Sequence, residues 1–251
     1  MRAAMVEELL GKRALARLAW LLTLSAVLIL LIGTTELDLR LADAMYDARL
    51  GAFPWNHAWL TERFGHGILK VALTILAVLP VLACLWDLLP RQRRRLPVWW
   101  RLRMRLLALC AILVPTIISL LKQASHSHCP WDLQRYGGSQ PYYHLLEQIP
   151  EWVDAGHCLP GGHASSALWL LGLVVFWLPH RPRTAAMVAV LTLAFGAAVG
   201  WMQQMRGAHF LTHTLWSMWI AAAVVTLLLL LARYRRAAAR ALQGTESGAP
   251  V

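Results

Sequence analysis

Six long apolar blocks, nearly free of charge, restrict the fold of this chain more than any other feature. They cover residues 18–35, 68–86, 106–121, 164–179, 184–205 and 214–232. A helix that crosses the hydrocarbon core of a bilayer needs about 20 apolar residues and pairs its backbone polar groups internally. The sequence therefore predicts an all-α membrane protein with six transmembrane helices.

The blocks follow one another without a soluble segment long enough to fold by itself. We therefore expect one membrane domain over residues 1–240 and a flexible tail over residues 241–251. The first block follows a basic segment, and no small-residue cleavage site comes after it. It is expected to be retained as a helix rather than removed as a signal peptide.

The distribution of charge predicts how the helices are oriented. If the N-terminus is cytoplasmic, 17 of the 24 Lys and Arg residues lie on the cytoplasmic side, and the outer loops hold 9 of the 13 acids. Retention of basic residues on the cytoplasmic side accounts for the net charge of +11, so nucleic acid is not an expected partner. We expect a bacterial inner-membrane protein whose outer loops face the periplasm.

Seven of the ten histidines lie in two outer segments, where the chain leaves the third and fifth blocks. They are His126, His128, His144, His157, His163, His209 and His213. The sequence therefore predicts that groups able to do chemistry gather on the outer face.

The stretch Pro160-Gly161-Gly162-His163 reads as a turn that opens the fourth helix. Glycine amides at the start of a helix are suited to binding an anion, because the N–H groups are free and the helix dipole is positive there. The alternative is a glycine-rich loop with a capping histidine.

A second polar stretch joins the fifth and sixth blocks. Arg206 has a guanidinium that can fork onto phosphate oxygens, and His209 and His213 lie four residues apart on one helix face. A neutral imidazole of His209 can attack phosphorus. The alternatives are a cluster that touches lipid head groups and, for Lys122 at the end of the third block, a side chain that reaches to the interface.

Three elements here, in this order, resemble the signature of the type-2 phosphatidic acid phosphatase superfamily. The family has a Lys–six–Arg-Pro element, a Pro-Ser-Gly-His element and a Ser-Arg–five–His–three–Asp element. The matching positions are Lys122, separated by six residues from Cys129-Pro130, then Pro160-Gly161-Gly162-His163, then Arg206 to His213. The resemblance implies a phosphatase-like core over about residues 106–232 within six helices, with the site facing outward.

The resemblance also implies roles for these residues, with no metal and no cofactor. His209 resembles the nucleophile that forms a phosphohistidine, and His163 resembles the general acid for the leaving group. Lys122 and the amides of Gly161 and Gly162 resemble the donors that stabilise developing negative charge.

Five positions depart from the family pattern. Cys129 stands in place of Arg, Gly161 in place of Ser, Met202 in place of Ser, Gln203 in place of Arg, and His213 in place of the Asp that orients the nucleophile. We expect His213 to accept the hydrogen bond that orients His209. Arg206, Gln203 and Arg135 are the remaining side chains expected to contact phosphate.

Two cysteines lie in the outer loop and two in apolar blocks. Because a periplasmic loop is in an oxidising compartment, we predict a Cys129–Cys158 disulfide, which would contribute about 3–4 kcal/mol by closing its loop. A zinc site is the alternative interpretation, with ligands among His126, His128, Cys129, His157 and Cys158 or at His209 and His213. It is disfavoured because the stretch from His209 to His213 lacks the glutamate base of zinc hydrolases and an oxidised pair provides no thiolates.

The expected function is hydrolysis of a membrane lipid phosphate or pyrophosphate. The resemblance implies undecaprenyl pyrophosphate, phosphatidylglycerophosphate, phosphatidic acid or the phosphates of lipid A as substrates. A phosphotransferase and an inactive lipid-phosphate-binding or scaffold protein are the alternatives, and the sequence does not indicate the oligomeric state.

Overall fold

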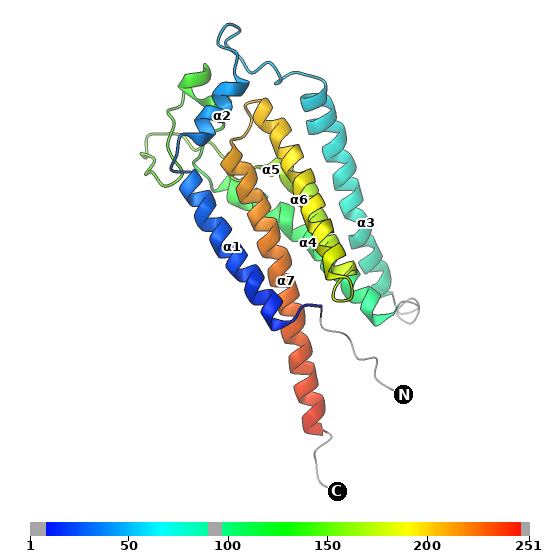
Figure 1. Cartoon of the computed structure of the whole chain (residues 1–251). Coiled ribbons are helices and arrows are strands. Elements are labelled where there is room, and N and C mark those ends of the chain that lie inside the picture. The colour runs from blue at the N-terminus through cyan, green and yellow to red at the C-terminus, as the bar shows by residue number, and fades with distance from the viewer. Residues whose placement is uncertain (1–8, 90–96, 247–251) are drawn as a thin grey trace.

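The computed structural model describes residues 9–89 and 97–246, and long helices lying side by side form most of it (Figure 1). Their bounds are α1 (Lys12–Ile32), α3 (Lys70–Leu88), α4 (Val98–Gln123), α6 (Pro182–Met205) and α7 (Leu211–Glu246). Shorter pieces join them: α2 (Leu37–Met45), the π-helix η1 (Leu60–Leu69), the 3-10 turns η2 (Pro130–Asp132) and η3 (Gln134–Tyr136), α5 (Gly162–Leu168) and the 3-10 helix η4 (Trp169–Phe176). The beginning of α1 and the end of α7 lie at one end of the bundle, and the loops from α4 to α5 and from α6 to α7 lie at the other (Figure 1).

Among the described residues, five helices are long and apolar enough to cross a membrane. They are Lys12–Ile32, Leu60–Leu88, Val98–Gln123, Pro182–Met205 and Leu211–Arg235. Five of the six predicted spans are therefore confirmed by length and composition. The predicted fourth span is a shorter apolar helix, Gly162–Phe176, made of α5 and η4.

This short helix nevertheless runs along most of α4. At one end Gly162 lies against Lys122, and at the other Arg103 donates to the carbonyl oxygens of Val175 and Leu178. A 3-10 helix rises about 2.0 Å per residue, so seven α and eight 3-10 residues cover about 26 Å. Glycine at position 172 lets the two helices approach closely, because a Cβ there would lie 2.8 Å from the Cys110 sulfur.

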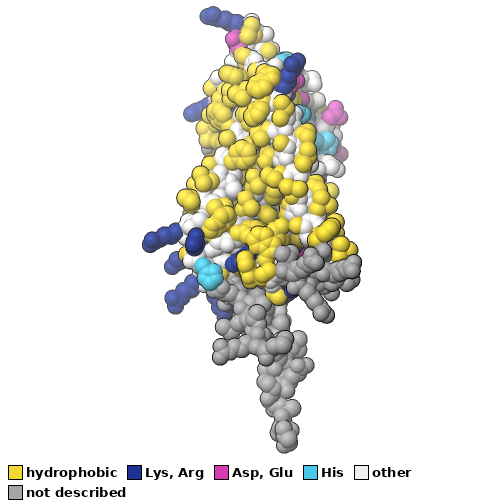
Figure 2. All heavy atoms as spheres, turned by 90° about the vertical axis from the view of Figure 1, so that its right-hand side faces the viewer, with side chains coloured by type: hydrophobic (Ala, Val, Ile, Leu, Met, Phe, Trp, Pro, Cys, Tyr) yellow, Lys and Arg dark blue, Asp and Glu magenta, His cyan; other side chains and the backbone are white. Residues whose placement is uncertain are grey.

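The outer surface of the bundle is apolar over most of its length. Figure 2 shows hydrophobic side chains covering the middle of one face, with Lys and Arg side chains toward the two ends. Large apolar side chains stand exposed on the peripheral helices, among them Trp20 and Leu24 on α1 and Ile75 and Leu82 on α3. A water-facing surface of this kind would be unfavourable, and lipid tails match it, so the chain is a membrane protein.

Two boundaries differ from the sequence prediction. The second span begins at Leu60, because η1 continues into α3, so residues expected in the outer loop belong to the helix. At the C-terminus α7 continues to Glu246, so the first residues of the predicted flexible tail are helical. The rest of that tail, residues 247–251, and the basic run 91–95 lie outside the described residues.

The segment between α1 and η1 covers the loop end of the bundle. In α2, the buried carboxylate of Asp38 accepts hydrogen bonds from the backbone N–H and the hydroxyl of Thr212, in the first turn of α7. Beside it, Leu39 and Phe53 pack against Leu133 and Phe210. The outer segment thus shields the junction between α6 and α7 from solvent.

Candidate active site

Lys122 and the start of α5 form one side of the candidate site. Lys122 lies in the last turn of α4, and a Cβ added to Gly162 would lie 4.0 Å from its Nζ atom. Gly162 therefore lies directly beside the lysine side chain. The neighbouring amide is engaged, since the N–H of Gly161 donates to the carbonyl oxygen of His213 over 2.9 Å. The sequence predicted that this N–H would bind an anion. Its hydrogen bond to His213 joins α5 to α7 instead, so the anion site has one donor fewer than predicted.

His163, the second residue of α5, stands at the centre of a group of imidazole rings. Its ring centroid lies 5.9 Å from that of His209 and 4.4 Å from that of His66. Both of its ring nitrogens are shielded from solvent and have no hydrogen-bond partner within the described part of the chain. Buried polar atoms without partners are uncommon and indicate a place for a polar ligand.

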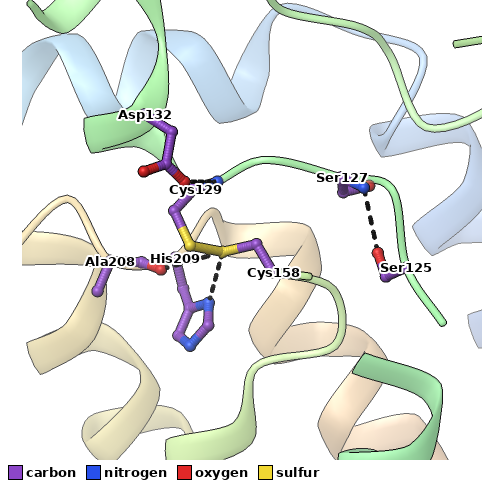
Figure 3. Close-up of a disulfide and its surroundings, with 7 residues drawn as sticks. All are labelled: Ser125, Ser127, Cys129, Asp132, Cys158, Ala208 and His209. Carbon is purple, nitrogen blue, oxygen red and sulfur yellow. Dashed lines mark hydrogen bonds between the residues drawn. A yellow bond between two sulfur atoms is a disulfide. The ribbon is translucent and has the colours of Figure 1, made fainter. Parts of the chain in front are cut away.

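His209 lies in the short connection between α6 and α7 and is almost fully buried. Its Nδ1 atom is 3.3 Å from the Cys158 sulfur, as Figure 3 shows. That sulfur is bonded to Cys129, so the structure contains the disulfide that the sequence predicted. An Nδ1–H that faces the sulfur leaves the Nε2 lone pair free for chemistry.

His213 does not take the orienting role expected for it. Its ring centroid is 5.7 Å from that of His209, and its own Nδ1 has no partner among the described residues. His213 lies beside His209, but the side-chain contact of His209 Nδ1 is with the Cys158 sulfur of the disulfide. The backbone of His213 has a structural role, because its carbonyl oxygen accepts from Gly161 and Ser217.

Arg206 is held at the edge of this group by polar contacts. Its Nε donates to the carbonyl oxygen of Asn56 and its Nη1 donates to the side-chain oxygen of Gln203. Gln203 is fully buried, and its side-chain oxygen accepts from Arg206. Gln203 therefore positions the arginine and does not present this oxygen to the candidate site. Burial lowers the pKa of Arg206 from its ordinary value, although the guanidinium remains charged at neutral pH.

Arg135 lies apart from these residues. Its guanidinium makes two hydrogen bonds, of 2.7 and 2.8 Å, to the carboxylate of Asp43 in α2. This ion pair holds the pKa of Asp43 below its ordinary value. The expectation that Arg135 contacts phosphate is not supported by this arrangement, since the partner is a carboxylate in the outer segment.

A family comparison matches this same region. The model of the PAP2 superfamily matches residues 103–237, more than half of the chain. The chain belongs to the PAP2 superfamily. No curated protein and no solved structure gives a significant match. Phosphatase-type hydrolysis of phosphate esters, on phosphorylated lipid-type substrates, is the general activity of this superfamily.

The PAP2 motif departures have partners in the structure. Cys129, in place of arginine, forms the disulfide beside His209, and Gln203, also in place of arginine, binds Arg206. At each of these two positions, a neutral residue in place of the family's arginine thus contacts or positions another residue of the candidate site. A soft metal would find two sulfurs and Nδ1 of His209 within 4.8 Å of one another, but sulfurs joined in a disulfide are not thiolate ligands.

Two residues of this PAP2 chain that the sequence analysis did not select reach the same group. The ring of His66 contacts that of His163 at an interplanar angle of 43°, and Lys70 follows His66 by four residues on the same helix face. Lys70 is close enough for its charge to act on His66, Lys122 and His163. The i to i+4 spacing was visible in the sequence, but residue 66 was assigned to a loop, so the shared face was missed.

We expect Lys70→Met to weaken phosphate binding by this group. The extra cation offsets the arginines absent at positions 129 and 203, and a hydrogen bond to a charged group contributes roughly 1.5–3 kcal/mol. The predicted loss in kcat/KM for a lipid phosphate is about tenfold. Arg63→Met, an exposed position in η1, is the matched control and should change kcat/KM by less than about twofold. Equal losses in both variants would show that only the surface charge matters.

Proposed function

We propose that this protein hydrolyses a membrane lipid phosphate or pyrophosphate through a phosphohistidine on His209. The observation that carries the proposal is the convergence of Lys122, His163 and His209 at one end of the bundle, with both ring nitrogens of His163 unpartnered among the described residues. The elements that supply them are far apart in the sequence, so their meeting depends on the fold.

The arrangement supports transfer in two steps. Nε2 of His209 attacks phosphorus, and the bond from phosphorus to the leaving oxygen breaks as His163 gives that oxygen a proton; His163 takes up this proton when the anionic phosphate group binds beside it. Water then attacks the phosphohistidine, His163 takes a proton from it, and phosphate leaves with neutral His209 restored. Lys122, Lys70 and Arg206 stabilise the negative charge on the phosphoryl oxygens.

The environment of His209 fits a neutral nucleophile. Burial, with the nearby His213, His163 and Lys122, lowers the pKa of His209 well below the ordinary value of 6.5. A histidine whose pKa is depressed stays uncharged as the pH falls through 6.5, so its lone pair remains free.

This predicts a specific NMR titration. The ¹⁵N chemical shifts of His209, assigned by comparison with His209→Gln, should stay those of a neutral ring as the pH falls from 8 through 6.5. A midpoint for His209 at or above 6.5 would argue against the neutral resting nucleophile.

We also propose that the chain crosses the membrane six times and that the site faces the periplasm. The excess of basic residues at the opposite end and the length of the short helix against the roughly 30 Å hydrocarbon core support this. In intact cells, Glu151→Cys should react with a membrane-impermeant maleimide, whereas Arg181→Cys should react only after permeabilisation. The reverse pattern would exclude this orientation.

The activity is tested with purified protein in detergent. Phosphate release is measured with EDTA present, against phosphatidic acid, phosphatidylglycerophosphate, undecaprenyl pyrophosphate and a lipid A. Release from at least one lipid at an undiminished rate in EDTA is the expected result. Absence of release from all four, or transfer of the phosphoryl group to an added lipid without free phosphate, would overturn hydrolysis.

A further inference from the structure

Two sulfur atoms and a ring nitrogen form a compact buried cluster that the proposed reaction does not use chemically. The sulfurs of Cys129 and Cys158 and a ring nitrogen of His209 all lie within 4.8 Å of one another. All three residues are buried, with exposed fractions of 8%, 0% and 4%. In Figure 3 the imidazole of His209 points toward the disulfide from the connection before α7.

The loops on both sides fix this cluster in place. The N–H of Cys129 donates to the carboxylate of Asp132, and the N–H of Cys158 donates to the carbonyl oxygen of Ser127. The connection between α6 and α7, which carries His209, is held by Trp131, whose N–H donates to the carbonyl oxygen of Gly207. None of these contacts involves a cysteine sulfur, so the same contacts are available when the bond between the two sulfurs is absent.

The oxidised cluster is a poor metal site, but the reduced cluster has strong donors. A dithiol reductant converts the disulfide to two thiols and is itself oxidised to a disulfide, with two electrons and two protons passing to the protein. Zinc then displaces the two thiol protons, and two thiolates with one imidazole are a typical zinc donor set. The negative charges of the two thiolates balance the two positive charges of the zinc ion, which would lie near Lys122.

The geometry requires little movement. Zinc bonds of about 2.3 Å to sulfur and 2.0–2.1 Å to nitrogen place tetrahedral ligand atoms roughly 3.6–3.8 Å apart. Nδ1 of His209 is already 3.3 Å from the Cys158 sulfur. Only the two sulfurs must separate, by about 2 Å from bonding distance, which rotation of a cysteine side chain provides. The ring centroid of His213, whose Nδ1 has no partner among the described residues, lies 5.7 Å from that of His209.

We propose that reduction of the Cys129–Cys158 disulfide turns this cluster into a zinc site that captures His209. The metal site stands independently, while its effect on turnover rests on the proposed function of His209 as nucleophile. A reduced, zinc-loaded protein is inactive in this scheme, because the metal withdraws electron density from the imidazole and fixes it. Oxidation of the cysteine pair releases the metal and restores the site.

The test measures bound zinc before any activity. Full-length protein in detergent, either oxidised or reduced with an immobilised dithiol under argon, is incubated with zinc chloride, desalted and analysed by elemental mass spectrometry. Reduced wild type is expected to retain one zinc per chain more than oxidised wild type. Cys129→Ser, Cys158→Ser and His209→Gln, all under reductant, should lose at least tenfold in zinc affinity.

Matched controls separate a specific site from general thiol or histidine binding. Reduced wild type and the serine variants all lack the crosslink, so its loss does not explain a difference between them. Cys84→Ser with Cys110→Ser removes the free cysteines and should leave zinc retention unchanged. Equal zinc in oxidised and reduced protein, or retention by Cys158→Ser, would overturn the proposal.

The activity arm is read separately. Phosphate release by reduced protein loaded with zinc should fall at least tenfold and return after EDTA treatment and reoxidation. Full activity with zinc bound would disprove capture of the nucleophile. If no preparation releases phosphate from any lipid, the proposed function fails, and zinc stoichiometry alone decides whether the metal site exists.

Discussion

Replacing His209 with glutamine is expected to abolish phosphate release while leaving the fold intact. Loss of a covalent nucleophile costs about 10³–10⁶-fold in kcat, because no other group can form the same intermediate. Glutamine keeps a polar side chain of similar size in a buried place that alanine would leave partly empty. The rate of phosphate release and the melting temperature, measured on the same preparation, separate the two effects.

The companion variant His163→Gln should fail in a different way. If His163 protonates the leaving oxygen, its loss matters greatly for a lipid alkoxide and little for a good leaving group such as p-nitrophenolate. His209→Gln should be inactive toward both. Exposed His126→Gln is the control and should behave as wild type. A His209→Gln protein with more than about a tenth of wild-type activity would rule out the phosphohistidine, since residual rates without the nucleophile are far lower.

The membrane architecture was largely predictable because it follows from local composition. Long apolar blocks require helices in lipid, and five of the predicted spans have the necessary length in the structure. The fourth differs because it is packed among other helices, where Gly172 and a 3-10 segment fit it against α4. Burial among helices, rather than hydropathy, determines that geometry.

Which residues meet was partly predictable, whereas the partners of individual atoms were not. The order of Lys122, His163 and His209 along the chain indicated a shared site, and the structure brings them together. Hydrogen-bond partners depend on tertiary neighbours. For that reason Gly161 donates to His213, and Arg135 binds Asp43. His66 and Lys70 were missed because a single π-helical segment changes which residues belong to a helix.

Removing the disulfide is expected to lower the stability of the outer part of the structure strongly. Cys129 and Cys158 are separated by 29 residues, and closing a loop of that length contributes about 3–4 kcal/mol in the chain-entropy model. Because the disulfide joins the loop after α4 to the turn before α5, its loss acts on the segments that carry Lys122 and His163. We expect Cys129→Ser/Cys158→Ser to unfold at a clearly lower denaturant concentration than wild type under oxidising conditions.

The comparison that makes this decisive is between oxidised and reduced protein, with a chelator present to exclude metal. Reduction should lower the midpoint of wild type to that of the double variant and leave the double variant unchanged, because only wild type has a crosslink to lose. Cys84→Ser/Cys110→Ser, which keeps the disulfide, should respond to reductant as wild type does. A wild-type midpoint that does not move on complete reduction would mean that backbone contacts such as Cys158 N–H to Ser127 hold this region by themselves, so the sulfurs would matter for His209 alone.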